Sequence, residues 1–537
     1  MKRVFMKPKI FTVIIFCIFA GNLFSQPTIV NQKTIGGNGG DNLQDICLTN
    51  DGGIIVGGYS NSGISGEKTK KSRGVYDYWV VKLNKHQKIQ WNKTIGGSSF
   101  DELTAVQQTS DGGYILGGFS NSKISGEKTQ ATRGGYDYWI VKLDSSGSIE
   151  WDKTIGGNSD DELNSLQQTS DGGYILGGYS ESDVSGEKTQ ISRGRGYDYW
   201  IVKVDNLGNI QWDKTIGGNG YDNLHSLQQT NDGGFILGGT STSGISGEKT
   251  QISRGIEDYW IVKVDNLGNI QWDKTIGGNS DDELYSLQQT RDGGYILGGT
   301  SYSGISGEKS QRSRGVTDYW IVKVDNVGNI QWDKTVGGNG YDNLHSLQQT
   351  NDSGFILGGA STSGLSGEKT ENNDGNYDYW IVKLNENGHI QWDKTIGGNG
   401  YDNLYSINEI SKNHYAMGGG SFSGISFDKT DTSRGSSDYW IVYLDYHSPG
   451  LKTGNVTSIT ANSIHNNFSV YPVPAKYLLH VITNGKAVVT LTDLSGKILL
   501  TNAINGSGTI NVAGLAPSVY YLKNNATGSS QKVIVIK

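Results

Sequence analysis

Short runs of alternating apolar and polar residues recur along the chain about every 60 residues. One unit contains four such runs, at residues 223–230 (NLHSLQQT), 233–241 (GGFILGGTS), 258–265 (DYWIVKVD) and 269–276 (NIQWDKTI). They are rich in aromatic and β-branched residues and are bounded by Gly, Asn and Asp, which is typical of β-strands. No helical periodicity interrupts them, so the pattern predicts four antiparallel strands per unit.

This unit of about 60 residues occurs seven times in the sequence. The word KT[IV]GG begins at Lys33, Lys93, Lys153, Lys214, Lys274, Lys334 and Lys394. The word DYW ends at Trp79, Trp139, Trp200, Trp260, Trp320, Trp380 and Trp440. Repeated four-stranded units of this kind predict a β-propeller.

The two ends of the array complement each other. Residues 28–35 form a fourth-type strand with no third strand before it, whereas the last third strand, Ile441–Asp445, has no fourth strand after it. We expect the two to pair, because this closes the ring and removes two open sheet edges. An open solenoid would not need this arrangement. The fold class predicted is therefore all-β: a seven-bladed β-propeller, with the SLQQT strand lining the channel, followed by a small β-sandwich.

The predicted domain boundaries follow changes in composition. Residues 1–25 are basic, then apolar, then small and polar, as in a secretory signal peptide. The propeller is expected at 26–445, a polar linker at 446–466 and a C-terminal domain with alternating apolar positions at 467–537. No later segment is apolar enough to cross a bilayer, so no integral membrane segment is expected after cleavage.

Charge and cysteine content narrow the function classes. The formal net charge is −7, and loss of residues 1–25 removes four basic and no acidic residues, which gives −11. An acidic protein is a poor partner for nucleic acid, which is bound by neutralising phosphates. Only Cys47 would remain after cleavage, so no internal disulfide is expected. Its apolar strand context predicts a buried, inert thiol.

Two resemblances follow from these motifs. Segments such as DGGYILGGYS and DYWIVKLDSSGSIEWDKTIGG resemble the secreted bacterial β-propeller repeat of the SBBP type, over about residues 28–445. This resemblance implies the fold and no particular ligand.

The C-terminal stretch resembles the type A sorting domain of the Bacteroidetes type IX secretion system. The motif residues are Tyr471, Pro472, Pro474, Gly496, Lys497, Val519 and Tyr520, together with the terminal KVIVIK. Val473 and Ser518 depart from the family pattern, which usually has Asn and Gly there. The resemblance implies the type IX machinery as a partner and a secreted, extracellular location. It also implies that the tail is removed or used to attach the protein to the outer cell surface.

A long insertion joins the second and third strands of every unit and contains SGEK followed by Arg. Unit six has Asp374 in place of Arg, and unit seven has Phe427 and Asp428 in place of Gly and Glu. We expect a self-packed loop whose charged residues form exposed pairs of about 0–1 kcal/mol. Its predicted apolar anchors are Ile64, Ile124, Val184, Ile245, Ile305, Leu365 and Ile425. The alternative is a ring of polar loops that grips a repetitive glycan by avidity.

Two rings of aspartates recur with the units. They are Asp41, Asp101, Asp161, Asp222, Asp282, Asp342 and Asp402, and Asp77, Asp137, Asp198, Asp258, Asp318, Asp378 and Asp438. The D-x-D-x-D-G spacing that calcium loops use is absent. We therefore expect these aspartates to cap turns, and predict neither a metal nor a cofactor.

One position varies where its neighbours do not. It is occupied by Gln44, Thr104, Asn164, His225, Tyr285, His345 and Tyr405, and nearby loops add Tyr221, Tyr341 and Tyr401. The strand order predicts that these residues line the channel mouth, where the aromatic ones are candidates for stacking on sugars. The alternative is a solvated position that drifted without constraint.

No Ser-His-Asp set, metal-spaced His/Cys cluster or phosphate loop occurs in the sequence. We expect a non-enzymatic binding protein for a glycan or a surface partner. The alternatives are a polysaccharide-active propeller enzyme, which needs one asymmetric acid/base cluster, and a structural surface or matrix component without a small ligand.

Overall fold

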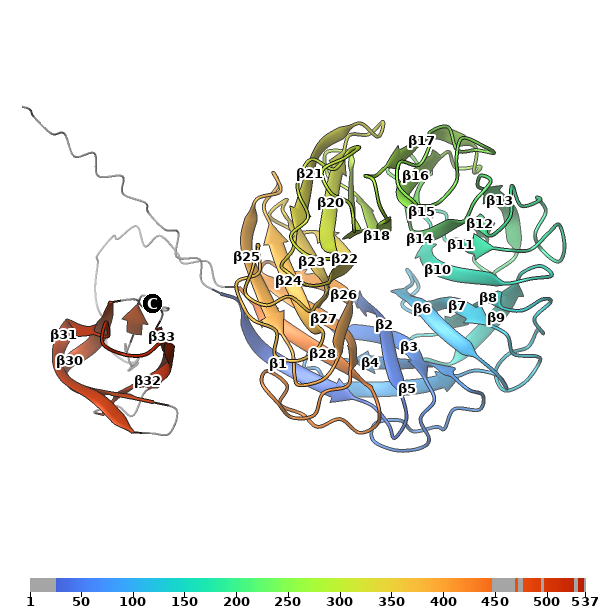
Figure 1. Ribbon diagram of the computed structural model, residues 1–537. Helices are drawn as coiled ribbons and strands as arrows, with labels where there is room; N and C mark the ends of the chain where they lie inside the picture. Colours follow the sequence, from blue (N-terminus) through green and yellow to red (C-terminus); the bar gives the residue numbers. More distant parts are fainter. Residues whose placement is uncertain (1–25, 447–468, 472–476, 494–496, 526–529, 536–537) are drawn as a thin grey trace, which may run out of the picture. The chain divides into compact units, whose positions relative to one another are not determined.

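The computed structural model describes residues 26–446, 469–471, 477–493, 497–525 and 530–535 (Figure 1). In these ranges the regular elements are all β-strands, and no helix there has the length and apolar character that a membrane crossing requires. The chain divides into two compact units, Met1–Gly450 and Leu451–Lys537. The predicted signal peptide and most of the predicted linker lie outside the described residues.

The first unit consists of seven four-stranded antiparallel sheets, which are the predicted blades. The inner strands are β2 (Asp41–Leu48), β6 (Asp101–Gln108), β10 (Asp161–Gln168), β14 (Asp222–Gln229), β18 (Asp282–Gln289), β22 (Asp342–Gln349) and β26 (Asp402–Ser411). The second strands are β3 (Ile54–Ser60), β7 (Tyr114–Ser120), β11 (Tyr174–Ser180), β15 (Phe235–Ser241), β19 (Tyr295–Ser301), β23 (Phe355–Ser361) and β27 (His414–Ser421). The third strands are β4 (Asp77–Leu83), β8 (Asp137–Leu143), β12 (Asp198–Val204), β16 (Asp258–Val264), β20 (Asp318–Val324), β24 (Asp378–Leu384) and β28 (Asp438–Asp445). The outer strands are β5 (Ile89–Ile95), β9 (Ile149–Ile155), β13 (Ile210–Ile216), β17 (Ile270–Ile276), β21 (Ile330–Val336), β25 (Ile390–Ile396) and β1 (Thr28–Ile35).

The ring closes as predicted. Strand β1 pairs antiparallel with β28, with Thr28 opposite Asp445 and Lys33 opposite Ile441. The inner strands of consecutive blades contact one another around the channel, and β26 contacts β2 (Figure 1). The first unit is therefore a closed seven-bladed β-propeller.

The DYW word builds the seams between blades. Tyr138 and Trp139 are fully buried, and the hydroxyl of Tyr138 donates to the backbone carbonyl of Trp200 on the next blade at 2.9 Å. The same bond crosses the closing seam, from Tyr439 to the carbonyl of Trp79 at 2.8 Å. Each seam thus buries two large rings and satisfies the tyrosine hydroxyl, which explains why the word is repeated without change.

The two glutamines of SLQQT also join blades, a role that the sequence did not reveal. The side-chain oxygen of Gln107 accepts the backbone N–H of Gln168 on the next blade at 2.6 Å. The side-chain oxygen of Gln168 accepts the N–H of Ser110, in a turn of the previous blade, at 2.8 Å. Blade one lacks this pair and carries Cys47 instead, toward whose sulfur the N–H of Gln108 points at 3.4 Å. Cys47 is half-buried rather than buried, and burial raises the pKa of its thiol to about 11, as suits an inert cysteine.

The second unit is a five-stranded sheet that folds around its own core. The strands are β29 (Ser469–Tyr471), β30 (Leu478–Thr492), β31 (Ile498–Asn511), β32 (Ser518–Asn524) and β33 (Ser530–Val535). The pairing of β30 with β31 is interrupted between Ile482 and Lys486. Side chains from both halves of β30, such as Val481 and Leu491, share one hydrophobic cluster.

Candidate functional site on the long-loop face

The lysine of SGEK is buried, contrary to the expectation of an exposed pair. Lys128 is 1% exposed, and its Nζ lies 5.0 Å from the centroid of the Trp139 ring and 2.6 Å from Thr154 Oγ1. Burial lowers its pKa to about 8, although the carboxylates of Asp101 and Asp137 oppose this shift. The motif therefore places a cation inside each blade.

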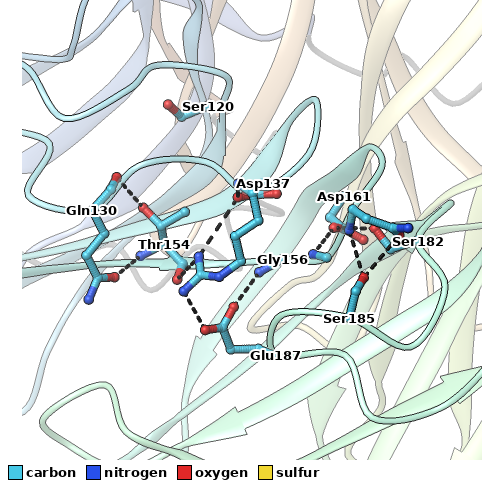
Figure 2. Close-up of polar contacts among 12 residues, drawn as sticks. Ser120, Gln130, Asp137, Thr154, Gly156, Asp161, Ser182, Ser185 and Glu187 are labelled. Atoms are coloured by element: carbon cyan, nitrogen blue, oxygen red, sulfur yellow. Dashed lines mark hydrogen bonds and ion pairs between the residues drawn. The ribbon is translucent and has the colours of Figure 1, made fainter.

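The glutamate and arginine of the loop connect neighbouring blades. Arg133 Nη2 lies 2.5 Å from Glu187 Oε1 on the next blade, and the other oxygen of Glu187 accepts the N–H of Gly156 at 3.1 Å (Figure 2). We call this contact the inter-blade latch. Its six copies are Arg73–Glu127, Arg133–Glu187, Arg193–Glu248, Arg254–Glu308, Arg314–Glu368 and Arg434–Glu67. The missing copy would join Asp374 to Asp428, so the two departures seen in units six and seven are two halves of one seam.

The predicted apolar anchors do not pack. Val184 is 54% exposed and Ile64 is 72% exposed, and the other five lie between these values. The prediction that these residues fix the loop is therefore wrong. The contacts that hold the loop are those of the buried lysine and of the latch. The seven side chains form a ring of exposed aliphatic residues.

The aspartates of both rings accept hydrogen bonds from backbone N–H groups, and some also accept hydrogen bonds from serine hydroxyls. Asp161 Oδ2 accepts the N–H of Gly157 at 2.7 Å and the hydroxyl of Ser182 at 2.9 Å (Figure 2). Asp137 Oδ2 accepts the N–H of Arg133 at 2.7 Å. These contacts agree with the capping interpretation.

Four of the predicted ligand residues form a continuous row of rings on the inner strands of blades four to seven. The ring centroids of His225 and Tyr285 are 5.0 Å apart, those of Tyr285 and His345 are 5.5 Å apart, and those of His345 and Tyr405 are 5.1 Å apart. Burial lowers the pKa of both histidines to about 4, so both are neutral at pH 7. The hydroxyl of Tyr285 donates to the carboxylate of Glu283.

The variation at this position is matched by the second strand. In blades one to three the small or polar residues Gln44, Thr104 and Asn164 accompany the aromatic residues Tyr59, Phe119 and Tyr179. In blades four to seven the larger rings accompany Thr240, Thr300, Ala360 and Gly420. In blade four both members, His225 and Thr240, line the same cavity. We therefore interpret the variation as volume compensation rather than free drift.

This cavity has a volume of about 200 Å³ and is built by blades three, four and five. Its walls are Tyr197, Tyr221, Asn223, His225, Thr240, Glu257, Glu283 and Tyr285. Three predicted residues, Tyr221, His225 and Tyr285, are thus brought together. Tyr341 and Tyr401 are 42% and 48% exposed, and they lie outside this wall together with His345 and Tyr405.

The sequence analysis missed the acidic wall of the cavity. Glu257 precedes its DYW word at a position that holds Tyr, Thr or Ser in the other blades. Aligning the seven copies column by column would have revealed this single acid. The inner strands also line a second cavity of about 470 Å³, at the end that carries Gln107 and Gln228.

Comparison with known proteins identifies the second unit. Residues 469–537 match the family described as the secretion system C-terminal sorting domain. The chain ends in a sorting domain. This domain indicates export and a secreted or cell-surface location. Of its predicted motif residues, Lys497 is exposed and Tyr520 is buried, with its hydroxyl donating to the carbonyl of Ala516 at 2.7 Å. Val519 lies in β32 and Tyr471 ends β29. Pro472, Pro474 and Gly496 lie outside the described residues.

The solved structures that are similar have low sequence identity to this chain. Sqt1 from Chaetomium thermophilum is 11% identical, covering 78% of this chain and all of that chain with a TM-score of 0.38. The Pan2 WD40 domain of Neurospora crassa is 9% identical, covering 78% of this chain and 96% of that chain with a TM-score of 0.39. A puromycin hydrolase is 9% identical, covering 83% of this chain and 59% of that chain with a TM-score of 0.39. No curated protein matches the sequence.

Proposed function

We propose that the propeller is a non-enzymatic binding module, exported by its sorting domain, that binds a glycan or a surface partner outside the cell. The observation that carries this proposal is the row His225–Tyr285–His345–Tyr405, in which successive ring centroids are 5.0–5.5 Å apart. Aromatic faces with a polar edge suit sugar rings, which present both C–H faces and hydroxyl groups. A row across four blades offers successive contacts to an extended ligand.

A glycan array with the purified propeller tests the proposal. We expect saturable binding that falls at least tenfold in a Tyr285→Ala, His345→Ala, Tyr405→Ala variant. The control is Leu207→Ala, which alters a 59% exposed residue in the turn between β12 and β13. Unchanged binding by the triple variant would disprove a role for the row. Absence of both binding and turnover would favour a structural surface component.

One observation favours a second candidate, an enzyme that acts on polysaccharide. Glu257 and Glu283 line one cavity in different environments, and this pair occurs in one blade junction only. Two carboxylates with distinct surroundings are what general acid/base cleavage of a glycosidic bond uses. Release of reducing ends from a polysaccharide, abolished by Glu257→Gln, would establish this candidate in place of the binding module.

A further inference from the structure

The cavity at blades three to five is lined by a small residue of blade four, at a position where blades one to three have a ring. Thr240 occupies the position of Tyr59, Phe119 and Tyr179 on the second strand. Its neighbour across the sheet is Asn223, and both line the cavity. The 51% exposed Tyr221 lines the same cavity.

The hydroxyl of Thr240 has no partner within the described part of the chain. The residue is 5% exposed, and its Oγ1 makes no hydrogen bond there. A buried hydroxyl without a partner is unfavourable, so native proteins rarely leave one in place without a reason. A polar group of a bound molecule would satisfy it.

The carboxylates on the cavity wall lack a cationic partner. Within residues 26–446 neither Glu257 nor Glu283 forms an ion pair, and the loop arginine of the same blade, Arg254, is held by Glu308 at 2.5 Å. Burial raises the pKa of Glu257, and the charges of Glu283 and Asp281 raise it further. The cavity therefore holds two carboxylates that no basic side chain in the described residues neutralises, although Glu283 accepts the hydroxyl of Tyr285.

Aromatic rings stand beside these carboxylates. The ring centroids of Tyr197 and Tyr221 are 5.0 Å apart at an interplanar angle of 54°, and both line the cavity. Ring faces attract cations. His225 adds no competing positive charge near neutral pH, because burial lowers its pKa to about 4.

We propose that this cavity binds a small molecule with one protonated amine. The ammonium would lie against Glu257 and Glu283 and beside the rings of Tyr197 and Tyr221, with a hydroxyl of the ligand bonded to Thr240. Charge-assisted hydrogen bonds and cation–π contacts then act on the same group. The inference rests on the proposed binding function and names the chemical class recognised at one subsite, with amino sugars as the members that suit a glycan-binding propeller.

Calorimetric titration of the full chain with four probes tests this. Glucosamine, N-acetylglucosamine and glucose share one ring and differ in the charge at one carbon, while n-butylamine carries the ammonium without a sugar. We expect saturable binding of glucosamine, at least tenfold tighter than that of its two neutral analogues. Equal binding of butylamine would support recognition of the ammonium alone, whereas preference for glucosamine would support an amino sugar. Equal binding of the neutral sugars, or no binding of either amine, would overturn the proposal.

Variants place the site. Glu257→Gln keeps the shape of the wall and should weaken glucosamine binding at least tenfold. The double variant His225→Asn, Thr240→Tyr gives blade four the pair Asn164 and Tyr179 of blade three, so it should fill the cavity without changing the unfolding midpoint. The matched control is the reverse exchange in blade one, Gln44→His with Tyr59→Thr, which should leave amine binding unchanged.

The outcomes separate the two proposals. Amine binding that survives the filled cavity would show that the site lies elsewhere and would disprove this inference. Binding on the glycan array that depends on Tyr285, His345 and Tyr405, combined with no amine binding, would refute the amine subsite and leave the proposed function standing. Absence of array binding by the unaltered propeller, together with amine binding that Glu257→Gln weakens, would do the reverse.

Discussion

At the scale of one residue, the lysine of the SGEK motif is buried although it lies in a polar stretch of the sequence. Its neighbours in sequence are polar, yet its ammonium lies over a buried tryptophan and near carboxylates of two strands. These neighbours come from positions far apart in the unit. The sequence therefore predicted where the loop lies and failed to predict which of its charges is buried.

Replacing this lysine should be costly. Lys128→Met keeps the length and apolar stem of the side chain but leaves Asp101 and Asp137 without their buried cation. We expect unfolding free energy to fall by about 3 kcal/mol, because breaking a buried charge cluster by removing one partner is strongly destabilising. Urea denaturation measures this, with Lys123→Met in the exposed part of the same loop as the control. A loss of less than about 1 kcal/mol, as at a surface site, would contradict the burial argument.

Several buried aspartates give stability a defined dependence on pH. Burial raises the pKa of Asp137 and Asp378 to about 7, and it raises to about 6 the pKa of Asp77, Asp198 and Asp282. In an unfolded chain the pKa of Asp is about 4. The folded protein thus binds more protons between these values, so this contribution is fully present below about pH 4 and is lost as the pH rises through 7.

We accordingly expect a lower free energy of unfolding at pH 7.5 than at pH 6.5, measured by urea denaturation at both values. His225 and His345, with folded pKa values of about 4, and Lys128, with a folded pKa of about 8, oppose this trend in part, because the unfolded chain holds their protons more tightly. The variant Asp137→Asn, Asp378→Asn should show a smaller difference. An equal difference in the variant and the wild-type protein would contradict the assignment.

At the scale of elements, the seam between blades six and seven differs from the six latched seams. Asp374 and Asp428 stand where the other seams have the arginine and glutamate of the latch. Phe427 occupies a position that is glycine in the other blades, and its own φ is positive, at 49°. In blade one, a Cβ added at the corresponding Gly66 would lie 2.0 Å from the carbonyl oxygen of Gly36 and 2.7 Å from Cδ of the latch arginine, Arg434. A side chain at this position therefore crowds the backbone and the arginine, and loss of the arginine removes one of these two contacts.

Restoring the latch should stabilise the propeller only if the phenylalanine is also removed. We expect the triple variant Asp374→Arg, Phe427→Gly, Asp428→Glu to gain about 1 kcal/mol, from relief of a left-handed non-glycine residue and a half-exposed ion pair. Asp374→Arg alone should be neutral or destabilising. Thermal unfolding of the wild type, Asp374→Arg, the double variant Phe427→Gly, Asp428→Glu and the triple variant measures the coupling, and additive effects would show that the two sides of the seam do not interact.

The strands themselves were predictable because their patterns are local. Alternating apolar residues and glycine turns indicated all four strands of each unit. The contacts between strands of different blades were not predictable in the same way. The glutamines of SLQQT and the exposed aliphatic ring depend on what the neighbouring blade presents, and single-unit patterns carry no such information.

At the scale of the whole molecule, the ring could be derived from two incomplete ends that fit one another. Seven copies and a displaced strand leave one closed arrangement without open edges. The cavity at blades three to five could not be derived, because its wall combines residues of three blades, among them the single acid at Glu257. Repetition thus determines the fold, whereas the differences between copies determine the candidate site.

The closing strand yields the last prediction. Gln32 of β1 accepts the indole N–H of Trp440 at 3.0 Å and donates to the carbonyl of Asp428 at 2.6 Å, so it performs for blade seven what Asp152 performs for blade two. Removing residues 26–36 would expose the edge of β28 and uncover Trp440. We expect the shortened protein to unfold at a lower temperature and to self-associate through this edge.

A peptide of residues 26–37 added in trans should restore the original unfolding temperature, since the strand contributes through pairing and not through its covalent connection. A peptide with the same residues in scrambled order is the control. Calorimetry and light scattering measure both effects. An unchanged unfolding temperature after removal of β1 would mean that six complete blades and a three-stranded seventh blade hold the ring without closure, and the account of the ends given above would then be wrong.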